Sequence, residues 1–194
     1  MNFQNLDISN LVADMKRPPE EQKAPLLTEQ FADLPYDEFE AVQLAEYSQH
    51  HYFSKGSFNC IDALQKMLEY TGPASVQIAT WKINEDSART LLRLKEAGKI
   101  TNLVGLIDFR TRSMDPQVFQ LVQGVFDQLV LSQCHAKVTT AEGAERYAVL
   151  LTSANYTNNP RWEFGLISTH PLQVLFYQNA LSIAIQDAAE PTTN

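Results

Sequence analysis

The chain of 194 residues is long enough for one domain with a substantial core, and its content of 44% hydrophobic and 10% aromatic residues excludes a disordered chain. The net charge of −8 does not exclude a polyanionic substrate, because binding depends on the local field at a site. Residues 1–11 lack the features of a secretory signal, and no apolar run approaches the roughly 18 residues of a membrane span, so we expect a cytoplasmic protein without stable membrane insertion.

An acidic extension opens the chain. Residues 1–50 carry three basic and ten acidic side chains, a net charge of −7, whereas residues 51–194 carry twelve and thirteen, a net charge of −1. The proline-rich, charged residues 16–27 are typical of a linker or extended arm, and residues 36–49 predict a short acidic helix. We expect the extension to pack on the following domain or to bind a protein partner. A sharper hypothesis is that it competes with nucleic acid for a basic surface.

The rest of the chain alternates between helical and strand patterns. The predicted elements are a helix at 57–72, a strand at 75–83, a helix at 85–99, a strand at 101–109, a helix at 115–129, three strands at 130–140, 146–153 and 163–169, and a helix at 172–188. This order predicts a mixed β-sheet flanked by helices, in an α/β or α+β sandwich, and we expect the α/β fold. Cys60 and Cys134 form neither a disulfide framework nor a zinc spacing, so both are expected to be small buried apolar residues.

Polar side chains gather on the three consecutive strands. His135 and Lys137 are two residues apart, so a strand would present both on one face, and Ser153 and Asn155 obey the same rule at the end of the next strand. Neutral imidazole is a competent nucleophile toward a phosphodiester, and lysine, hydroxyl and carboxamide groups stabilise the phosphoryl oxygens. A carboxylate such as Glu163 would fix the tautomer of the histidine. The five residues therefore predict a catalytic site for phosphodiester chemistry.

The segments HAK (135–137) and TSANYTNNPRWEFG (152–165) carry a resemblance to a known family. Their H-x-K, S-x-N and downstream glutamate resemble the signature of the phospholipase D superfamily, and the order of elements over roughly residues 57–185 is similar to that family's domain. The resemblance implies a phospholipase D-like domain at 51–194 after the acidic extension. It also implies a metal-independent nuclease that forms a phosphohistidine intermediate and needs no cofactor.

Two positions depart from the family pattern, and one motif is missing. Glu142 stands where the family has aspartate, and Thr152 stands where it has glycine. The family's mechanism uses two histidines, but this chain has one H-x-K. By resemblance to single-motif members, two copies would pair as a homodimer, each supplying its own His135. The remaining histidines lack the motif, and we expect His50 and His51 on a solvated loop.

Other interpretations of these residues stay open. The chain is either a DNA or RNA nuclease or a catalytically inactive member that serves as a binding or scaffold protein, an alternative favoured by Glu142, Thr152 and the acidic balance. Family members that act on phospholipids leave a lipid substrate open as well. Arg110 and Arg112, which follow a predicted strand, are expected to steer a phosphate backbone. Trp162 is expected in a core or an interface rather than on a base.

Overall fold

The computed structural model describes residues 28–31 and 42–189 of the chain. Its elements are β1 (Thr28–Phe31), β2 (Ser48–Ser54), α2 (Cys60–Thr71), β3 (Ala74–Thr80), α3 (Glu85–Glu96), β4 (Ile100–Asp108), α4 (Thr111–Met114), α5 (Pro116–Val125), β5 (Gln128–Ser132), β6 (Val138–Glu142), β7 (Tyr147–Thr152), β8 (Glu163–Ser168) and α6 (Pro171–Ala189). The strands form one mixed sheet in the order β1-β2-β8-β7-β6-β3-β4-β5. The predicted α/β fold with a mixed, helix-flanked sheet is confirmed.

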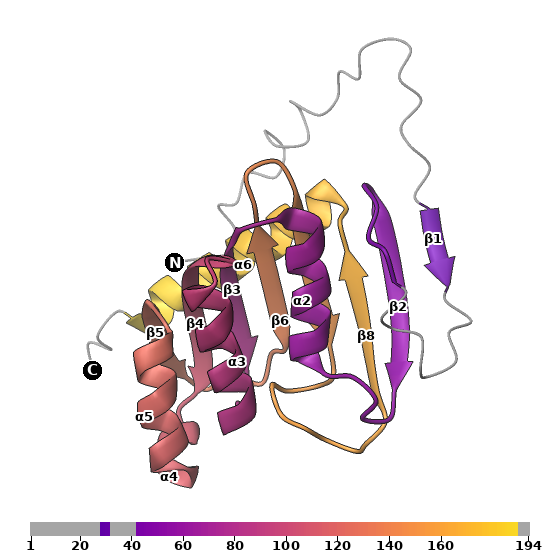
Figure 1. The fold of residues 1–194 in the computed structure, drawn as a ribbon. Helices are drawn as coiled ribbons and strands as arrows, with labels where there is room; N and C mark the ends of the chain where they lie inside the picture. Colours follow the sequence, from indigo (N-terminus) through magenta and orange to yellow (C-terminus); the bar gives the residue numbers. More distant parts are fainter. Residues whose placement is uncertain (1–27, 32–41, 190–194) are drawn as a thin grey trace.

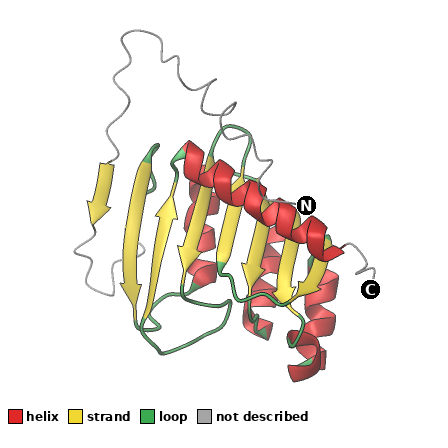
Figure 2. Cartoon of the chain, turned by 180° about the vertical axis from the view of Figure 1, so that it is seen from behind, coloured by secondary structure: helices red, strands yellow, loops and turns green. Residues whose placement is uncertain are grey.

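Helices cover both faces of the sheet. Helices α2, α3 and α5 lie on one face (Figure 1), and α6 crosses the other face over β3 to β7 (Figure 2). The larger hydrophobic core lies under α2, α3 and α5, and it includes Leu64, Ile78 and Leu91, none of them exposed. A smaller cluster under α6 joins Leu181 and Ile185 to the sheet. The two cores make a three-layer arrangement of helix, sheet and helix.

Local sequence signals set where the helices begin. Asn59 caps α2 through a reciprocal pair of bonds with the first turn, its side chain accepting the Ile61 N–H at 2.7 Å while Asp62 accepts the Asn59 N–H at 2.7 Å. The Asn84 side chain caps α3 by accepting the Ser87 N–H at 2.9 Å. Asp115 accepts the Val118 N–H at 3.1 Å at the start of α5, where a proline occupies the first turn. These caps satisfy backbone donors that the helices leave unpaired.

Strand directions bring many loops to one end of the sheet. Strands β3 and β4 are parallel, β6 is antiparallel to β3, and β7 and β8 continue antiparallel. Consequently β2, β3, β4, β5 and β7 end, and β6 and β8 begin, at the same edge, which we call the site edge. The connections at this edge carry the site residues that were predicted from the sequence.

Two predicted elements are wrong in the N-terminal part. The helix predicted at 36–49 is absent over its described part, because residues 42–45 are irregular and Ser48 already pairs in β2. Tyr47 has a φ of 57°, a left-handed conformation that no α-helix contains, and the Ser48 N–H binds the Thr169 hydroxyl at 2.9 Å. His50 and His51 lie in β2 rather than on a solvated loop, and His50 is buried.

The prediction of one strand at 130–140 is also wrong, because this segment contains parts of two strands, β5 and β6. β5 pairs with β4 at the edge of the sheet, whereas β6 pairs with β3 on the other side of β4. The chain therefore has to cross the ends of two strands between residues 132 and 138. The linker predicted at 16–27 lies outside the described residues, as does most of the acidic extension. Among the helices described, none is long and apolar enough to cross a membrane.

Candidate active site

His135 and Lys137 lie in the crossing between β5 and β6 rather than within a strand. The preceding residue, Cys134, is buried and anchors the crossing, while His135 is exposed and Lys137 is half-buried. The Lys137 ammonium donates to the His135 carbonyl oxygen at 2.9 Å. The His135 ring lies 6.2 Å, centroid to centroid, from the ring of Trp81, which follows β3. The imidazole and the ammonium thus stand at the site edge, next to an aromatic side chain.

Ser153, Asn155 and Glu163 come from the neighbouring turn between β7 and β8. The Ser153 hydroxyl donates to the Glu163 carboxylate, and the other carboxylate oxygen accepts the Asn159 amide at 3.1 Å. The side-chain amide oxygen of Asn155 accepts the hydroxyl of Thr80, at the end of β3, at 3.4 Å. The turn is therefore tied both to the start of β8 and to the end of β3.

The two segments meet through the sheet. The Thr152 N–H binds the Lys137 carbonyl oxygen at 3.2 Å, which extends the β6–β7 pairing to the residue that precedes Ser153. Burial lowers the pKa of Lys137, and the nearby Cys134, Glu163 and Cys60 oppose that shift. The Glu163 carboxylate is therefore near enough to the Lys137 ammonium for the two charges to interact. Within the described contacts, however, the carboxylate bonds Ser153 and Asn159, and its predicted pairing with the His135 ring stays a prediction.

A buried thiol and a phenol lie beneath this turn. Cys60, 1% exposed, donates to the Ala154 carbonyl oxygen at 3.4 Å, and burial together with the Glu163 and Asp62 charges raises its pKa to about 12. The Tyr52 hydroxyl donates to the Thr152 hydroxyl oxygen at 3.3 Å, and burial raises the pKa of that phenol. Both groups stay protonated at neutral pH, so they support the turn as hydrogen-bonding groups rather than as nucleophiles.

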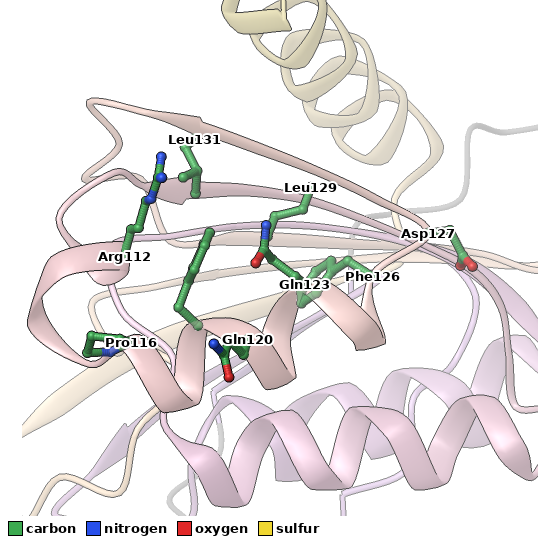
Figure 3. A pocket seen from close by; sticks show the side chains of 9 residues that line it. Arg112, Pro116, Gln120, Gln123, Phe126, Asp127, Leu129 and Leu131 are labelled. Carbon is green, nitrogen blue, oxygen red and sulfur yellow. The ribbon is translucent and has the colours of Figure 1, made fainter.

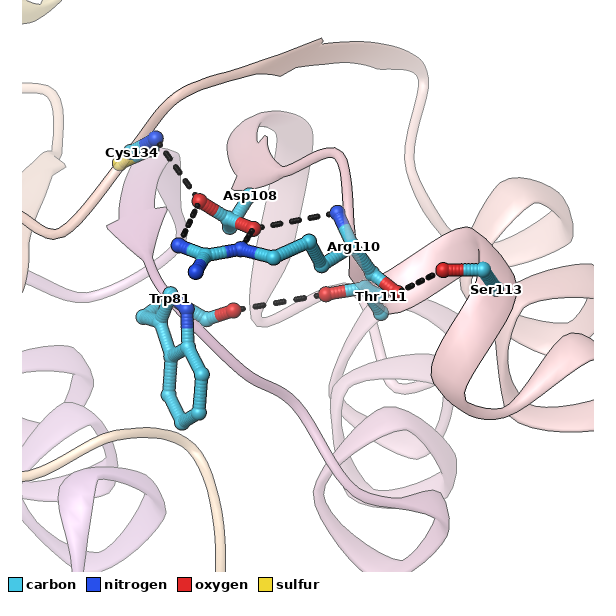
Figure 4. Close-up of polar contacts among 6 residues, drawn as sticks. All are labelled: Trp81, Asp108, Arg110, Thr111, Ser113 and Cys134. Atoms are coloured by element: carbon cyan, nitrogen blue, oxygen red, sulfur yellow. Dashed lines mark hydrogen bonds and ion pairs between the residues drawn. The ribbon is translucent and has the colours of Figure 1, made fainter.

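Asp108, at the end of β4, organises the opposite side of the site. Its carboxylate, on a side chain that is 1% exposed, accepts the Arg110 guanidinium at 2.6 and 2.9 Å and the Cys134 N–H at 3.2 Å (Figure 4). The guanidinium lies 5.7 Å from the centroid of the Trp81 ring. The Asp108 carboxylate thus links Cys134, the residue before His135, to the Arg110 guanidinium. The bonds from Arg110 hold the pKa of Asp108 below its ordinary value.

The two predicted phosphate-steering arginines are not equivalent. Arg110 contacts Trp81 and is thereby connected to His135, and its side chain is 52% exposed. Arg112 instead lines a groove of about 580 Å³ between α5 and β5 (Figure 3), together with Pro116, Phe119, Gln120, Gln123, Phe126, Asp127, Leu129 and Leu131. None of the other predicted site residues lines that groove.

The two departures from the family pattern have definite contacts. Glu142 ends β6 at the edge opposite the site and accepts the Gln178 amide of α6 at 3.1 Å, so it braces the helix against the sheet. The Thr152 hydroxyl donates to the Phe164 carbonyl oxygen at 2.7 Å and accepts the Ala154 N–H at 3.1 Å. Threonine at this position therefore ties the end of β7 to β8.

Sequence reasoning missed Asp108, Trp81, Thr80 and Asn159. A signal existed for Asp108, because a carboxylate that closes an apolar strand needs hydrogen-bonding partners if it is buried. Thr80 and Trp81 contact Asn155 and His135, which are distant in the sequence, whereas Asn159 binds the nearby Glu163 within an irregular turn that has no periodic pattern. Within residues 28–31 and 42–189, no cluster of three or more histidine, cysteine or acidic side chains could hold a metal ion.

Comparison with known proteins places the fold. No family model matches the sequence, and no curated protein matches it. NucT from Helicobacter pylori superposes with a TM-score of 0.54 at 16% identity, covering 72% of this chain and 97% of its own. Nuc from Salmonella typhimurium, a phospholipase D family member, gives 0.55 at 16% identity, with 73% and 95% covered.

A larger enzyme contains the same fold. Polyphosphate kinase from Porphyromonas gingivalis superposes with a TM-score of 0.56 at 14% identity, covering 96% of this chain but only 34% of its own. Identities this low establish shared architecture and leave the chemistry to the residues. The predicted fold class is confirmed: this chain has the fold of Nuc, a phospholipase D family member.

Proposed function

We propose that this protein is a phosphodiesterase of the phospholipase D type that cleaves nucleic acid. The observation that carries the proposal is the meeting of His135 and Lys137 with the turn of Ser153, Asn155 and Glu163 at one edge of the sheet. The set comprises a nucleophile, a half-buried cation and directed hydrogen-bonding groups, which phosphodiester cleavage requires. The fold shared with Nuc supports the same assignment.

In the proposed reaction an unprotonated ring nitrogen of His135 attacks phosphorus. A P–N bond forms, the P–O bond to the leaving alcohol breaks, and a general acid protonates the departing oxygen. The group that acted as the acid, now a base, takes a proton from water as the water attacks phosphorus; the P–N bond breaks, and His135 is regenerated as the phosphomonoester leaves. Lys137 and Asn155 bind the phosphoryl oxygens, Ser153 supports them, and Glu163 holds Ser153 in place. Arg110 attracts the neighbouring phosphates.

The general acid is proposed to come from a second copy of the chain. Of the four histidines, His50 and His51 lie within β2, and His170 immediately precedes α6 at the edge opposite the site. His135 is therefore the one histidine at the site edge of a single copy. A homodimer that brings two such edges together supplies the second imidazole, one acting as nucleophile and the other as acid.

The test is cleavage of single-stranded DNA, double-stranded DNA and bis(p-nitrophenyl) phosphate with EDTA present. We expect turnover by the wild type, loss of turnover in His135→Ala, and retention in His51→Ala, a control for removal of an exposed imidazole. Labelled substrate should also leave an acid-labile, alkali-stable phosphoryl group on the wild type. Turnover by His135→Ala, or activity that EDTA abolishes, contradicts the metal-independent phosphohistidine mechanism.

The alternative of a catalytically inactive binding or scaffold protein has one specific observation in its favour. The Lys137 ammonium binds a backbone carbonyl, and both Glu163 oxygens bind groups of the same turn, so these two charged groups have partners within the chain without a ligand. The same experiment separates the two functions. An inactive protein would bind oligonucleotides without cleaving any of the three substrates.

A further inference from the structure

Aromatic side chains are exposed on the α6 side of the sheet, in the part of β2 and β8 that the helix leaves uncovered. Phe53 and Phe164 are directly paired across β2 and β8, and each is 58% exposed. Trp162, 48% exposed, lies with its ring 5.3 Å from that of Phe53 at an interplanar angle of 36°. Helix α6 starts after β8 and crosses β7, β6, β3, β4 and β5 (Figure 2), and its hydrogen bond to β2, from Gln49 to Gln173 at 2.9 Å, lies at the edge opposite the site, away from Phe53 and Phe164. We call Phe53, Trp162 and Phe164 the aromatic patch.

The fold does not require aromatic rings at these positions. Strand residues facing water in a half-covered sheet are ordinarily polar. The residues of β2 and β8 that point to the other face, such as Tyr52 and Ile167, already supply the core contacts. Contiguous large apolar side chains on an uncovered surface mark an interaction site more often than isolated ones do. The patch therefore indicates a ligand with apolar, flat groups.

The charges beside the patch favour an anionic ligand. The Lys55 ammonium lies 5.5 Å from the centroid of the Trp162 ring, and Arg161, which precedes Trp162, is exposed. The one acidic side chain within the β8 strand, Glu163, is turned to the other face and bonded to Ser153 and Asn159. Exposed cations next to flat rings suit a ligand that combines phosphates with bases.

The patch lies at the same edge of the sheet as the proposed catalytic site, on the face opposite to Glu163. Trp162 and Phe164 flank Glu163 in the chain, and consecutive α-carbons are about 3.8 Å apart. Because strand side chains alternate, Glu163 faces the side of the sheet that carries α2, α3 and α5, whereas Phe164 faces the side that carries α6. A polynucleotide whose phosphate is bound near Lys137 can thus place neighbouring nucleotides over the patch.

We propose that the aromatic patch is a stacking platform for unpaired bases, which makes single-stranded nucleic acid the preferred substrate. This inference rests on the proposed function and deepens it. Bases of a duplex are stacked on each other and hidden from side-chain rings, whereas the bases of a single strand stack on aromatic platforms irrespective of sequence. A second copy of the chain fits the patch less well, since lysine is depleted in protein interfaces and a stable one needs roughly 20–30 residues a side.

The test compares conservative variants of one ring with a matched control. Phe53→Leu keeps the apolar bulk but removes the ring, and Phe53→Tyr keeps the ring. Phe176→Leu is the control, because Phe176 is 62% exposed but lies in the first turns of α6 at the opposite edge. Each change is placed in a His135→Ala chain. Fluorescence anisotropy then measures binding of a short labelled oligothymidylate and of a blunt duplex of the same length.

We expect Phe53→Leu to weaken oligothymidylate binding at least about fivefold, the lower limit for loss of one base–aromatic stack. Binding by Phe53→Tyr and Phe176→Leu should stay within about twofold of the parent, and duplex binding should not change. Full oligothymidylate affinity in Phe53→Leu, or equal loss for single strand and duplex, overturns the platform. A lower mass of Phe53→Leu in sedimentation overturns it in favour of a surface covered by a second copy.

Failure of the proposed function is visible separately. Hydrolysis of bis(p-nitrophenyl) phosphate, a diester too small to reach the patch, is measured in chains that retain His135. It should be equal in wild type and Phe53→Leu. A wild type that does not hydrolyse this diester contradicts the proposed catalysis, while the anisotropy result continues to decide the platform.

Discussion

Replacing Asp108 with alanine should both destabilise the protein and impair its site. The 1% exposed carboxylate accepts the Cys134 N–H at 3.2 Å, the Arg110 N–H at 3.1 Å and the Arg110 guanidinium at 2.6 and 2.9 Å. Alanine removes all four acceptor contacts at once. Of the donors, the Cys134 N–H belongs to a buried residue and cannot readily turn to water.

The magnitude follows from that one buried donor. A hydrogen bond to a charged group contributes about 1.5–3 kcal/mol to the free energy of unfolding. The Arg110 side chain is largely solvated, so loss of its ion pair adds little. In a domain of this size each kcal/mol lowers Tm by about 2–4 °C, which predicts a Tm about 3–12 °C lower for Asp108→Ala. Thermal unfolding followed by circular dichroism measures the shift.

Asp127 provides the matched control. Its carboxylate also accepts a buried backbone N–H, that of Leu103 at 2.7 Å, and a cation, Lys95 at 2.8 Å, but it lies near the start of β4, away from the site edge. Asp127→Ala should lose comparable stability. Only Asp108→Ala should free the segment before His135, lower phosphodiesterase turnover by about 10- to 100-fold beyond the control and expose the Cys134 thiol. Equal turnover and equal thiol protection in the two variants would refute the positioning role.

Three further predictions concern the same region. Bonds from Arg110 lower the pKa of Asp108. The charged carboxylate therefore stabilises the fold at pH values above its ordinary pKa of 3.8, and this stabilisation is lost as the pH falls below that value. The difference in the free energy of unfolding between wild type and Asp108→Asn, measured with urea, should shrink in acid. In Gly165→Ala the new Cβ would overlap the Tyr52 ring, which should cost about 1–3 kcal/mol in denaturant unfolding and be partly recovered by adding Tyr52→Leu. Native protein should not react with Ellman's reagent at about pH 8, because Cys60 and Cys134 are buried with raised pKa values, and denatured protein should react at both; rapid reaction of the native chain would contradict their burial.

Elements with strong local signals could be predicted, and those built by distant pairing could not. Helix α2 has its cap, its apolar face and its glycine stop within sixteen consecutive residues. Strand β2, by contrast, pairs with β8 more than a hundred residues later, so its residues follow distant partners rather than local propensity. His50 is buried for the same reason.

The site was predictable as a set of residues but not as a geometry. The spacing of His135, Lys137, Ser153 and Asn155 predicted their convergence, and the start of β6 and the end of β7 bring them to one edge. Their exact backbone setting depends on where β5 leaves the sheet, which periodicity cannot reveal in a continuous run of strand-forming residues. The partners of Glu163 likewise depend on a turn whose path is fixed by tertiary contacts.

Strand β8 couples the two proposed activities, because consecutive residues serve opposite faces. Glu163 binds Ser153 and Asn159 of the turn after β7, and Phe164 belongs to the aromatic patch. A shift of one residue in the pairing of β8 would exchange these faces and disable both. The contact of the Tyr52 ring with Gly165 opposes such a shift, since any side chain at that position would overlap the ring. The glycine therefore fixes the register on which both surfaces depend, and its replacement should affect cleavage and single-strand binding together.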